Sequence, residues 1–327
     1  MPREQVLKIL LDNKGNYISG EKISGDLGVS RAAICKDIKA LKIDGYNISS
    51  VNNKGYMLVE ETDTLNLVSI KNDVSNPLYT DNLLLFDTID STNTYAKKIA
   101  MDGAPHGSIV ISKEQTAGRG RLGKSFKSAM NNGLYISIIL RPNVVPLEAV
   151  NLTAYAAVAA SNAVLKACGH RPEIKWINDL VMNKKKIAGI LTEMAIEGES
   201  GLLDYIVLGI GINAYKNPNE FDSSLADIAT SIEEACGIHI SLNKLAACII
   251  NELDNMIKAW QDKSPEYHAI FKENCISLKA PLLVGKDKSP ATPVDIDSDY
   301  GLIVKFSDGT IATQNSGEVS VVGYCGM

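Results

Sequence analysis

The sequence has no long apolar run, which argues against a membrane-spanning helix. No hydrophobic segment reaches the roughly 18 residues that such a helix requires. The first residues also lack the apolar core of a signal peptide. Charged residues make up 22% of the chain, 45% of it is hydrophobic, and the net charge is −5, which is typical of an ordinary globular protein. We therefore expect a cytoplasmic protein.

Cysteine and histidine are scarce and scattered. The six cysteines form no C-x-x-C motif, and none is paired with a histidine at the spacing of a zinc site. This disfavours disulfides and a structural metal, as expected in a reducing compartment. The four histidines stand alone, and we assign no role to His106 or His170. The length of 327 residues predicts two or three domains.

The most informative segment is the glycine-rich run at 115–123. Its glycines fit the dinucleotide motif G-x-G-x-x-G, and a strand is predicted before it at 108–112. That motif requires a helix after the loop, whereas 124–133 has no helical period and 134–140 reads as another strand. The run therefore predicts a long, flexible loop between two strands. Arg119 and Arg121 suit it to be a lid over an anionic ligand, because guanidinium groups bind phosphate; the alternative is a solvated surface loop.

The first 60 residues predict a helix-turn-helix. A short helix at 5–11 precedes one capped by Ser19 and another capped by Ser30, with a turn at 28–29. Two strands at 46–50 and 55–59 would form a wing. Nine Lys/Arg and seven Asp/Glu give this part a net charge of +2, and the alternative is an interaction module that binds no DNA. The predicted DNA-binding residues are Ser30, Arg31, Ala32, Lys36, Lys39 and Lys54. We expect residues 60–64 to be a linker.

Three further segments place polar residues beside predicted strands. Residues 91–93 (Ser-Thr-Asn) lie between a strand and a helix, where they either bind a polar ligand or only cap the helix. Asn178 and Asp179 follow a strand that ends at Trp176; an amide beside a carboxylate suits a nucleotide–Mg²⁺ site, although the pair alone favours a turn. Lys186 closes a lysine triplet before a strand at 187–191, where it either neutralises phosphate or is merely solvated.

The remaining segments predict the scaffold. The strand at 208–213 carries glycines on one face, which would leave room for a planar ligand. Helices are expected at 147–167, at about 225–236 and at 242–260. Four or five short strands between 278 and 326 predict a small barrel.

These motifs together resemble the biotin protein ligase family, specifically its bifunctional BirA-type members that also repress biotin operons. The resemblance spans nearly the whole chain. Its specific pieces are Ser91-Thr92-Asn93, Gln115 with Gly118-Arg119-Gly120-Arg121, Lys175-Trp176-Ile177-Asn178-Asp179-Leu180, Lys186-Ile187-Ala188-Gly189-Ile190-Leu191 and Gly209-Ile210-Gly211-Ile212-Asn213.

The resemblance implies an α+β chain in three parts. These are a winged helix-turn-helix DNA-binding domain at 1–62, a mixed α/β ligase domain at 63–275 and a small SH3-like β-barrel at 276–327. It also implies ATP and biotin as substrates, Mg²⁺, a biotin carboxyl carrier protein domain and operator DNA as partners, and a ligand-induced homodimer. A lipoate-type ligase and a ligand-sensing repressor without catalysis are the alternatives.

Site residues follow from the same resemblance. Lys186 and Arg121 are the expected catalytic residues. Biotin is expected to contact Ser91, Thr92, Asn93, Gln115, Arg119, Gly120, Arg121, Lys186 and Gly189. The nucleotide is expected to contact Phe126, Lys175, Asn178 and Asn213, with Asp179 at the metal.

Two positions depart from the family pattern. Phe126 replaces a usual Trp, which predicts weaker stacking on adenine. Ile177 replaces a usual Pro, which loosens the turn that presents Asn178. Neither change removes a charged group, so we expect both to tune affinity.

Overall fold

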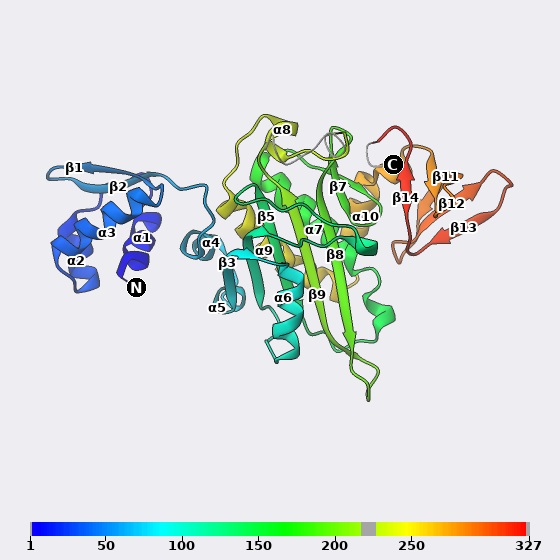
Figure 1. Ribbon diagram of the computed structural model, residues 1–327, viewed down its shortest axis with the longest axis horizontal. Coiled ribbons are helices and arrows are strands. Elements are labelled where there is room, and N and C mark those ends of the chain that lie inside the picture. Colours follow the sequence, from blue (N-terminus) through cyan, green and yellow to red (C-terminus); the bar gives the residue numbers. More distant parts are fainter. Residues whose placement is uncertain (1, 217–226, 325–327) are drawn as a thin grey trace.

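The computed structural model describes residues 2–216 and 227–324, and it consists of three parts in chain order (Figure 1). The predicted helix-turn-helix lies at one end, a seven-stranded sheet with its helices is in the middle, and a five-stranded antiparallel sheet lies at the other end. The boundaries between them, as drawn from the sequence, stay a prediction. Within the described ranges no helix is long and apolar enough to cross a membrane.

The N-terminal part is the predicted helix-turn-helix with a two-stranded wing. Ser19 and Ser30 accept hydrogen bonds from the backbone N–H groups of Lys22 and Ala33, which caps the second and third helices as expected. Gly28 ends the second helix at a φ of 64°, a left-handed conformation that glycine adopts without strain. The elements are α1 (Pro2–Asp12), α2 (Gly20–Leu27), α3 (Arg31–Ile43), β1 (Asn47–Val51) and β2 (Gly55–Glu60).

The central sheet has the strand order β3-β4-β5-β9-β8-β7-β6, in which only β3 and β4 are parallel neighbours. Its strands are β3 (Leu83–Ile89), β4 (Ile109–Gln115), β5 (Gly133–Leu140), β6 (Glu173–Lys175), β7 (Asp179–Met182), β8 (Lys185–Ile196) and β9 (Leu203–Asn213). Alternate residues of β4 and β9 belong to different apolar clusters, because successive side chains point to opposite faces.

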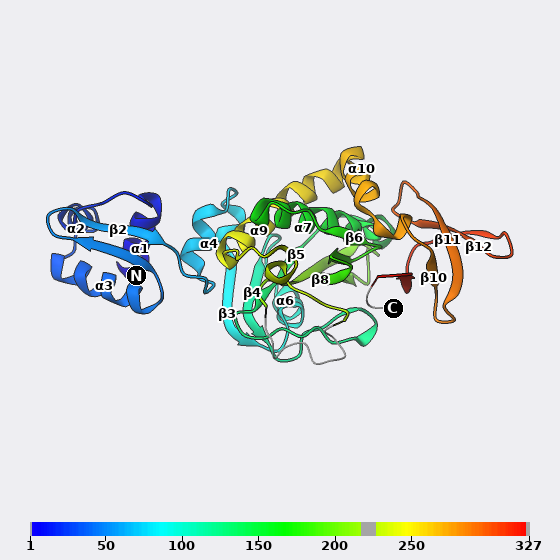
Figure 2. The ribbon, with the colours of Figure 1, turned by 90° about the horizontal axis from the view of Figure 1, so that it is seen from above.

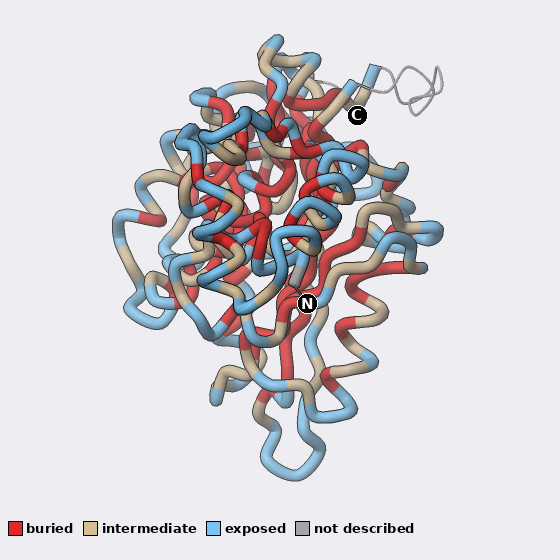
Figure 3. Tube along the Cα trace, turned by 90° about the vertical axis from the view of Figure 1, so that its left-hand side faces the viewer, coloured by how far each residue is buried: buried red, intermediate tan, exposed pale blue. Residues whose placement is uncertain are grey.

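Helices cover both faces of this sheet (Figure 2). α7 (Leu152–Cys168) and α9 (Leu242–Gln261) pack on one face and belong to the main core, and α6 (Thr92–Met101) packs on the other. The remaining central helices are α4 (Leu67–Asp73), α5 (Leu78–Asp81), α8 (Ile232–Cys236) and α10 (Pro265–Asn274). The buried residues gather inside the molecule, as Figure 3 shows.

The C-terminal sheet has the order β13-β12-β11-β10-β14 and is antiparallel throughout. Its apolar side chains join the core of the central part, and the Trp176 indole donates a hydrogen bond to the Tyr300 carbonyl across the junction. The strands are β10 (Leu282–Val284), β11 (Ser289–Ile296), β12 (Leu302–Phe306), β13 (Ile311–Gln314) and β14 (Val319–Val321).

Two predicted helices are shorter than expected. The helix expected at 147–167 begins at Leu152, because a 3₁₀ turn occupies Pro146–Ala149 and Asn151 stands at the helix start. Of the helix expected at about 225–236, residues 225–226 lie outside the described ranges, and the helical part begins only at Ile232. In the described segment before Ile232, Ile228 and Thr230 form backbone hydrogen bonds with Lys186. These hydrogen bonds hold the segment in an extended conformation.

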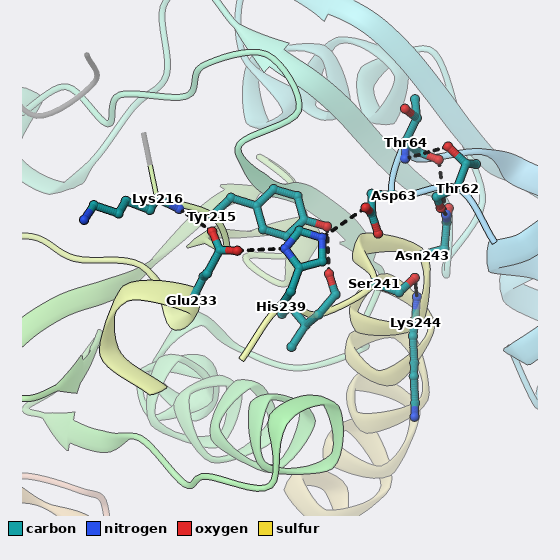
Figure 4. A network of polar contacts seen from close by, with 11 residues as sticks. Thr62, Asp63, Thr64, Tyr215, Lys216, Glu233, His239, Ser241, Asn243 and Lys244 are labelled. Carbon is teal, nitrogen blue, oxygen red and sulfur yellow. Dashed lines mark hydrogen bonds and ion pairs between the residues drawn. The ribbon is translucent and has the colours of Figure 1, made fainter. Parts of the chain in front are cut away.

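The linker after the wing is docked on the central part (Figure 4). The buried Asn243, at the start of α9, donates to the carbonyls of Thr62 and Thr64. His239 stacks on Tyr215 and contacts Asp63 at 3.0 Å and Glu233 at 2.8 Å. Hydrogen bonds to Glu233 and Asp63 raise the pKa of His239 above its ordinary value. Protonated His239 therefore fixes the linker to α8.

We expect this contact to be stronger in mild acid. A histidine with a raised pKa stabilises the folded state fully below its unfolded pKa of about 6.5, and this contribution is lost as the pH rises through the higher folded value. His239→Gln should therefore lower the Tm by at most about 2 °C near pH 6, since the half-exposed pairs are screened, and by less near pH 8. Thermal unfolding across this pH range measures both, and an equal difference at both pH values would contradict the assignment.

Candidate functional site

One pocket opens where the start of α6, the end of β4, the β4–β5 loop, the turn before β7 and the strands β8 and β9 meet. All nine residues predicted to contact biotin line it, together with the predicted nucleotide residues Phe126 and Asn178. The complete lining is Ser91, Thr92, Asn93, Gln115, Arg119, Gly120, Arg121, Phe126, Asn178, Lys186, Gly189, Ile190, Leu191, Gly209, Ile210 and Gly211.

Hydrogen-bonded polar side chains, most of them buried, form the floor of the pocket and the layer beneath it. The Gln115 amide oxygen accepts hydrogen bonds from the Thr92 backbone N–H at 2.8 Å and from its hydroxyl at 3.1 Å. The Ser137 hydroxyl lies 2.8 Å from the Thr92 hydroxyl and 2.6 Å from the Asn93 amide oxygen. Ser91 both caps α6 and lines the pocket, so helix capping and a position at the pocket do not exclude each other for this residue. The floor is rigid and rich in groups that can bind a polar ligand.

The loop between β4 and β5 is folded over the pocket by its own backbone hydrogen bonds. Phe126 N–H donates to the Gly118 carbonyl at 2.9 Å, and Gly120 N–H donates to the Lys124 carbonyl at 2.7 Å. A Cβ on Gly118 would lie 2.3 Å from the Phe126 carbonyl oxygen, so this approach requires glycine. We call residues 116–132 the lid.

Both lid arginines face acceptors across the pocket. Arg119 lies 3.4 Å from the Glu193 carboxylate, and Arg121 donates to the Asn178 amide oxygen at 2.8 Å. Burial alone would raise the pKa of Glu193, but hydrogen bonds from Lys97 and Asn93, with the charges of Lys97 and Arg119, lower it below its ordinary value. Glu193 therefore remains ionised beneath the lid and holds Arg119.

The far side of the lid meets the C-terminal sheet. Arg121 reaches the Gly317 carbonyl at 3.4 Å, and Lys124 lies 2.6 Å from the Glu318 carboxylate. Both acceptors belong to the turn between β13 and β14. The C-terminal sheet thus supports the closed lid from outside the pocket.

Lys186 projects from the start of β8 and forms an ion pair with Asp179 at 2.7 Å. Asp179 also accepts a hydrogen bond from Asn178 at 3.0 Å. Lys175, which pairs with Asp179 across β6 and β7, is half-buried, and burial lowers its pKa although Asp179 opposes the shift. Lys184, from the same triplet, lies instead over the Tyr324 ring at 5.8 Å. The triplet therefore places one of these two lysines at the pocket and the other away from it.

The glycine face of β9 lines the pocket, and the side chains of Asn93 and Phe126 lie close against it, so its use by a planar ligand stays a prediction. A Cβ on Gly209 would lie 2.0 Å from the Asn93 amide oxygen, and one on Gly211 would lie 2.7 Å from the Phe126 ring. Gly189 pairs with Gly211 across the two strands and also lies beside the Phe126 ring. A planar ligand could use this face only if Phe126 moved.

Three predicted residues lie outside the pocket lining. Asp179 pairs with Lys186, and Lys175 lies opposite Asp179 on the neighbouring strand. Asn213 is buried, and its side chain donates a hydrogen bond to the Thr230 carbonyl at 3.1 Å. The predicted DNA-binding side chains are exposed on α3, its cap and the wing, in the helix-turn-helix part of the chain. The assigned roles of all these residues stay predictions.

Sequence reasoning missed Glu193, Ser128 and Ser137. Ser128 accepts from the Gln115 amide nitrogen at 2.8 Å, and Ser137 joins Thr92 to Asn93. Glu193 lies in β8 beyond the part predicted at 187–191, Ser137 lies within the strand predicted at 134–140, and Ser128 lies in the lid. The one available signal was a carboxylate and two hydroxyls within or beside apolar strands, where a polar group needs a partner.

Comparison with known proteins agrees with this geometry. The biotin/lipoate A/B protein ligase family matches residues 85–213, and a helix-turn-helix domain family matches residues 2–57. The fold and site therefore define a ligase of the biotin/lipoate class joined to a helix-turn-helix.

Relatives that align with most or nearly all of the chain assign it to a particular family within this class. The bifunctional ligase/repressor BirA of Escherichia coli is 31% identical over 96% of this chain and 95% of its own. That of Bacillus subtilis is 37% identical over 72% of each chain. A biotin protein ligase from Aquifex aeolicus, solved with biotin and ATP, is 25% identical with a TM-score of 0.62, covering 73% of this chain and 97% of its own. The chain belongs to the bifunctional biotin ligase/repressor family.

The close contact at Gly209 gives a test of the site's packing. Gly209→Ala should destabilise the protein by about 1–3 kcal/mol, because the new methyl group would displace Asn93 from its hydrogen bonds. Gly198→Ala is the matched control, since no atom lies within 4 Å of its added Cβ. Denaturant unfolding measures both, and equal stabilities would show that Asn93 moves without cost.

Proposed function

We propose that this chain is an ATP-dependent biotin–protein ligase that also represses transcription in response to biotin. One observation carries the proposal: three cationic side chains and a rigid polar floor converge on one pocket, in a chain related to ligase/repressors along nearly its whole length. Biotin and ATP are the substrates, and a lysine of a biotin carboxyl carrier protein domain is the acceptor.

The floor suits the uncharged end of biotin. Its ureido ring offers one carbonyl acceptor and two N–H donors, and Thr92 with Gln115 supplies both kinds of partner. Ser91, Asn93, Gly120 and Gly189 complete this end of the pocket. Arg119 would close over the ligand from the lid.

The cations suit the charged end. In the first step the biotin carboxylate attacks the α-phosphorus of ATP, which gives biotinyl-5′-AMP and pyrophosphate. Negative charge must be balanced where carboxylate meets phosphate, and Lys186 and Arg121 would do so by exchanging Asp179 and Asn178 for ligand oxygens. In the second step the carrier lysine attacks the acyl carbon, and AMP leaves.

The nucleotide and Mg²⁺ would bind at the same end of the pocket. Asp179 and Asn178 offer oxygen ligands of the kind that Mg²⁺ takes, usually in combination with phosphate oxygens, and the ion would neutralise phosphate charge when bound. Lys175 and Asn213 would support the nucleotide from behind. Phe126 would stack on adenine, and its ring must leave Gly211 to do so.

The same pocket bears on two alternative functions of the chain. A lipoate-type ligase would use a similar adenylation site, and a repressor without catalysis would not need Lys186 at the reacting end. We therefore expect biotin, and not lipoate, to support ATP–pyrophosphate exchange. Exchange with lipoate alone would reassign the substrate, and no exchange with either acid would leave only the ligand sensor.

Lys186→Ala should slow adenylate formation by a barrier of about 3 kcal/mol, roughly a hundredfold, while hardly changing stability. Lys184→Ala is the matched control, because its ammonium group lies over Tyr324. Single-turnover formation of biotinyl-5′-AMP measures both. Equal losses in the two variants would mean that the triplet acts only as diffuse positive charge.

The repressor function rests on the helix-turn-helix. α3 would enter the major groove with Ser30, Arg31, Ala32, Lys36 and Lys39, and Lys54 on the wing would contact the backbone. A net charge of +2 over 60 residues offers few phosphate contacts, so one module would bind DNA weakly. We propose that the adenylate orders the lid and thereby creates a homodimer surface.

Biotin with ATP should accordingly drive the protein to a dimer that binds a two-fold symmetric operator, because two linked modules raise the effective concentration. Sedimentation and gel-shift titrations with and without both substrates measure the two effects. If neither the association state nor the DNA affinity changes with the ligand, residues 1–60 are a docking module.

A further inference from the structure

Two cysteines far apart in the sequence meet at the ends of two helices. Cys168 is the last residue of α7 and Cys236 is the last residue of α8. Each is followed by a glycine in the left-handed conformation, Gly169 with a φ of 77° and Gly237 with a φ of 69°. The backbone therefore turns directly after each cysteine, and His170 follows the turn at Gly169.

The donor atoms of Cys168, His170 and Cys236 all lie within 4.8 Å of one another. A tetrahedral zinc ion with the usual bond lengths needs donor separations of about 3.5–3.8 Å, so shifts of about an ångström or less would complete the set. The Met182 sulfur lies 3.8 Å from the Cys236 sulfur. The cluster is therefore rich in soft donors.

The surroundings resemble those of a metal-binding histidine. His170 Nδ1 lies 3.1 Å from the Cys168 carbonyl oxygen. When Nδ1 carries the proton and donates to that carbonyl, the lone pair of Nε2 is free to bind a metal, which is the arrangement that commonly orients zinc ligands. Cys168 and Met182 are buried whereas His170 is exposed, so the cluster has a buried side and an open side.

The electrostatic setting also favours a cation. α7 ends at the cluster after 17 residues, and the C-terminal end of a helix carries partial negative charge. Two thiolates with an imidazole form a ligand set that selects zinc or another soft cation over magnesium or calcium.

We infer that Cys168, His170 and Cys236 form a binding site for zinc, with Met182 beside it. The sequence disfavoured a structural metal because it has no C-x-x-C motif and no Cys/His pair at zinc spacing, whereas the fold brings Cys236 to Cys168 and His170. This inference is independent of the proposed ligase function.

The ion would fix the segment that precedes α8. Within this segment Ile228 and Thr230 form backbone hydrogen bonds with Lys186, and the Thr230 carbonyl accepts from Asn213. A metal joining α8 to α7 would therefore stabilise the chain that supports the charged end of the pocket.

Cobalt(II) titration tests the site in the full-length protein after treatment with a chelator and a reductant. We expect one equivalent of cobalt(II) to give a thiolate-to-metal charge-transfer band, and zinc(II) to displace it and raise the Tm. Cys236→Ser and His170→Ala should each weaken binding at least about tenfold. Cys248→Ser, a partly buried cysteine of α9 outside the cluster, should leave the titration unchanged.

Three outcomes would overturn the inference. The band could be absent, or it could persist unchanged in both ligand variants. Mass spectrometry of the untreated protein could instead find a Cys168–Cys236 disulfide without metal, which would make the pair a redox couple. Because His170 is exposed, His170→Ala decides the matter if Cys236→Ser does not fold.

Discussion

The pocket depends on holding three positively charged side chains on its lining. Arg119 and Lys186 do so through ion pairs with Glu193 and Asp179, whose side chains are 21% and 20% exposed, while Arg121 uses the Asn178 amide. Ion pairs with this degree of exposure are worth about 1 kcal/mol or less. They are strong enough to orient the cations and weak enough to be exchanged for phosphate oxygens. The site is thus arranged for an anion in advance.

The sheet supplies the positions for this arrangement. Gly189 and Gly211 pair across β8 and β9, so a flat patch lies where Phe126 of the lid rests. Asn93 fills the next space, at Gly209, and connects α6 to Ser137 and Glu193. The C-terminal sheet contacts the lid through Glu318 and Gly317. The central part of the chain therefore forms the pocket, and the C-terminal sheet contacts its lid.

Local signals in the sequence predicted much of this. Ser19, Ser30 and Gly28 marked the helix-turn-helix because caps and left-handed turns depend on single residues. The motif residues gathered on one pocket because strands and strand ends bring them to the same edge of the sheet. The partners across strands could not be foreseen: Glu193 and Ser137 become part of the site only through register. Cys236 meets Cys168 only through the packing of α8, and the segment before α8 is extended because it pairs with Lys186, a contact that no local pattern encodes.

A crystal structure with a non-hydrolysable biotinyl-adenylate analogue tests the account most directly. The account predicts that Lys186 leaves Asp179 and Arg119 leaves Glu193, that both side chains contact the ligand, and that Phe126 leaves Gly211. An analogue bound with both ion pairs and the Phe126 contact intact would contradict it, because Lys186 and Arg119 would then serve only contacts within the protein.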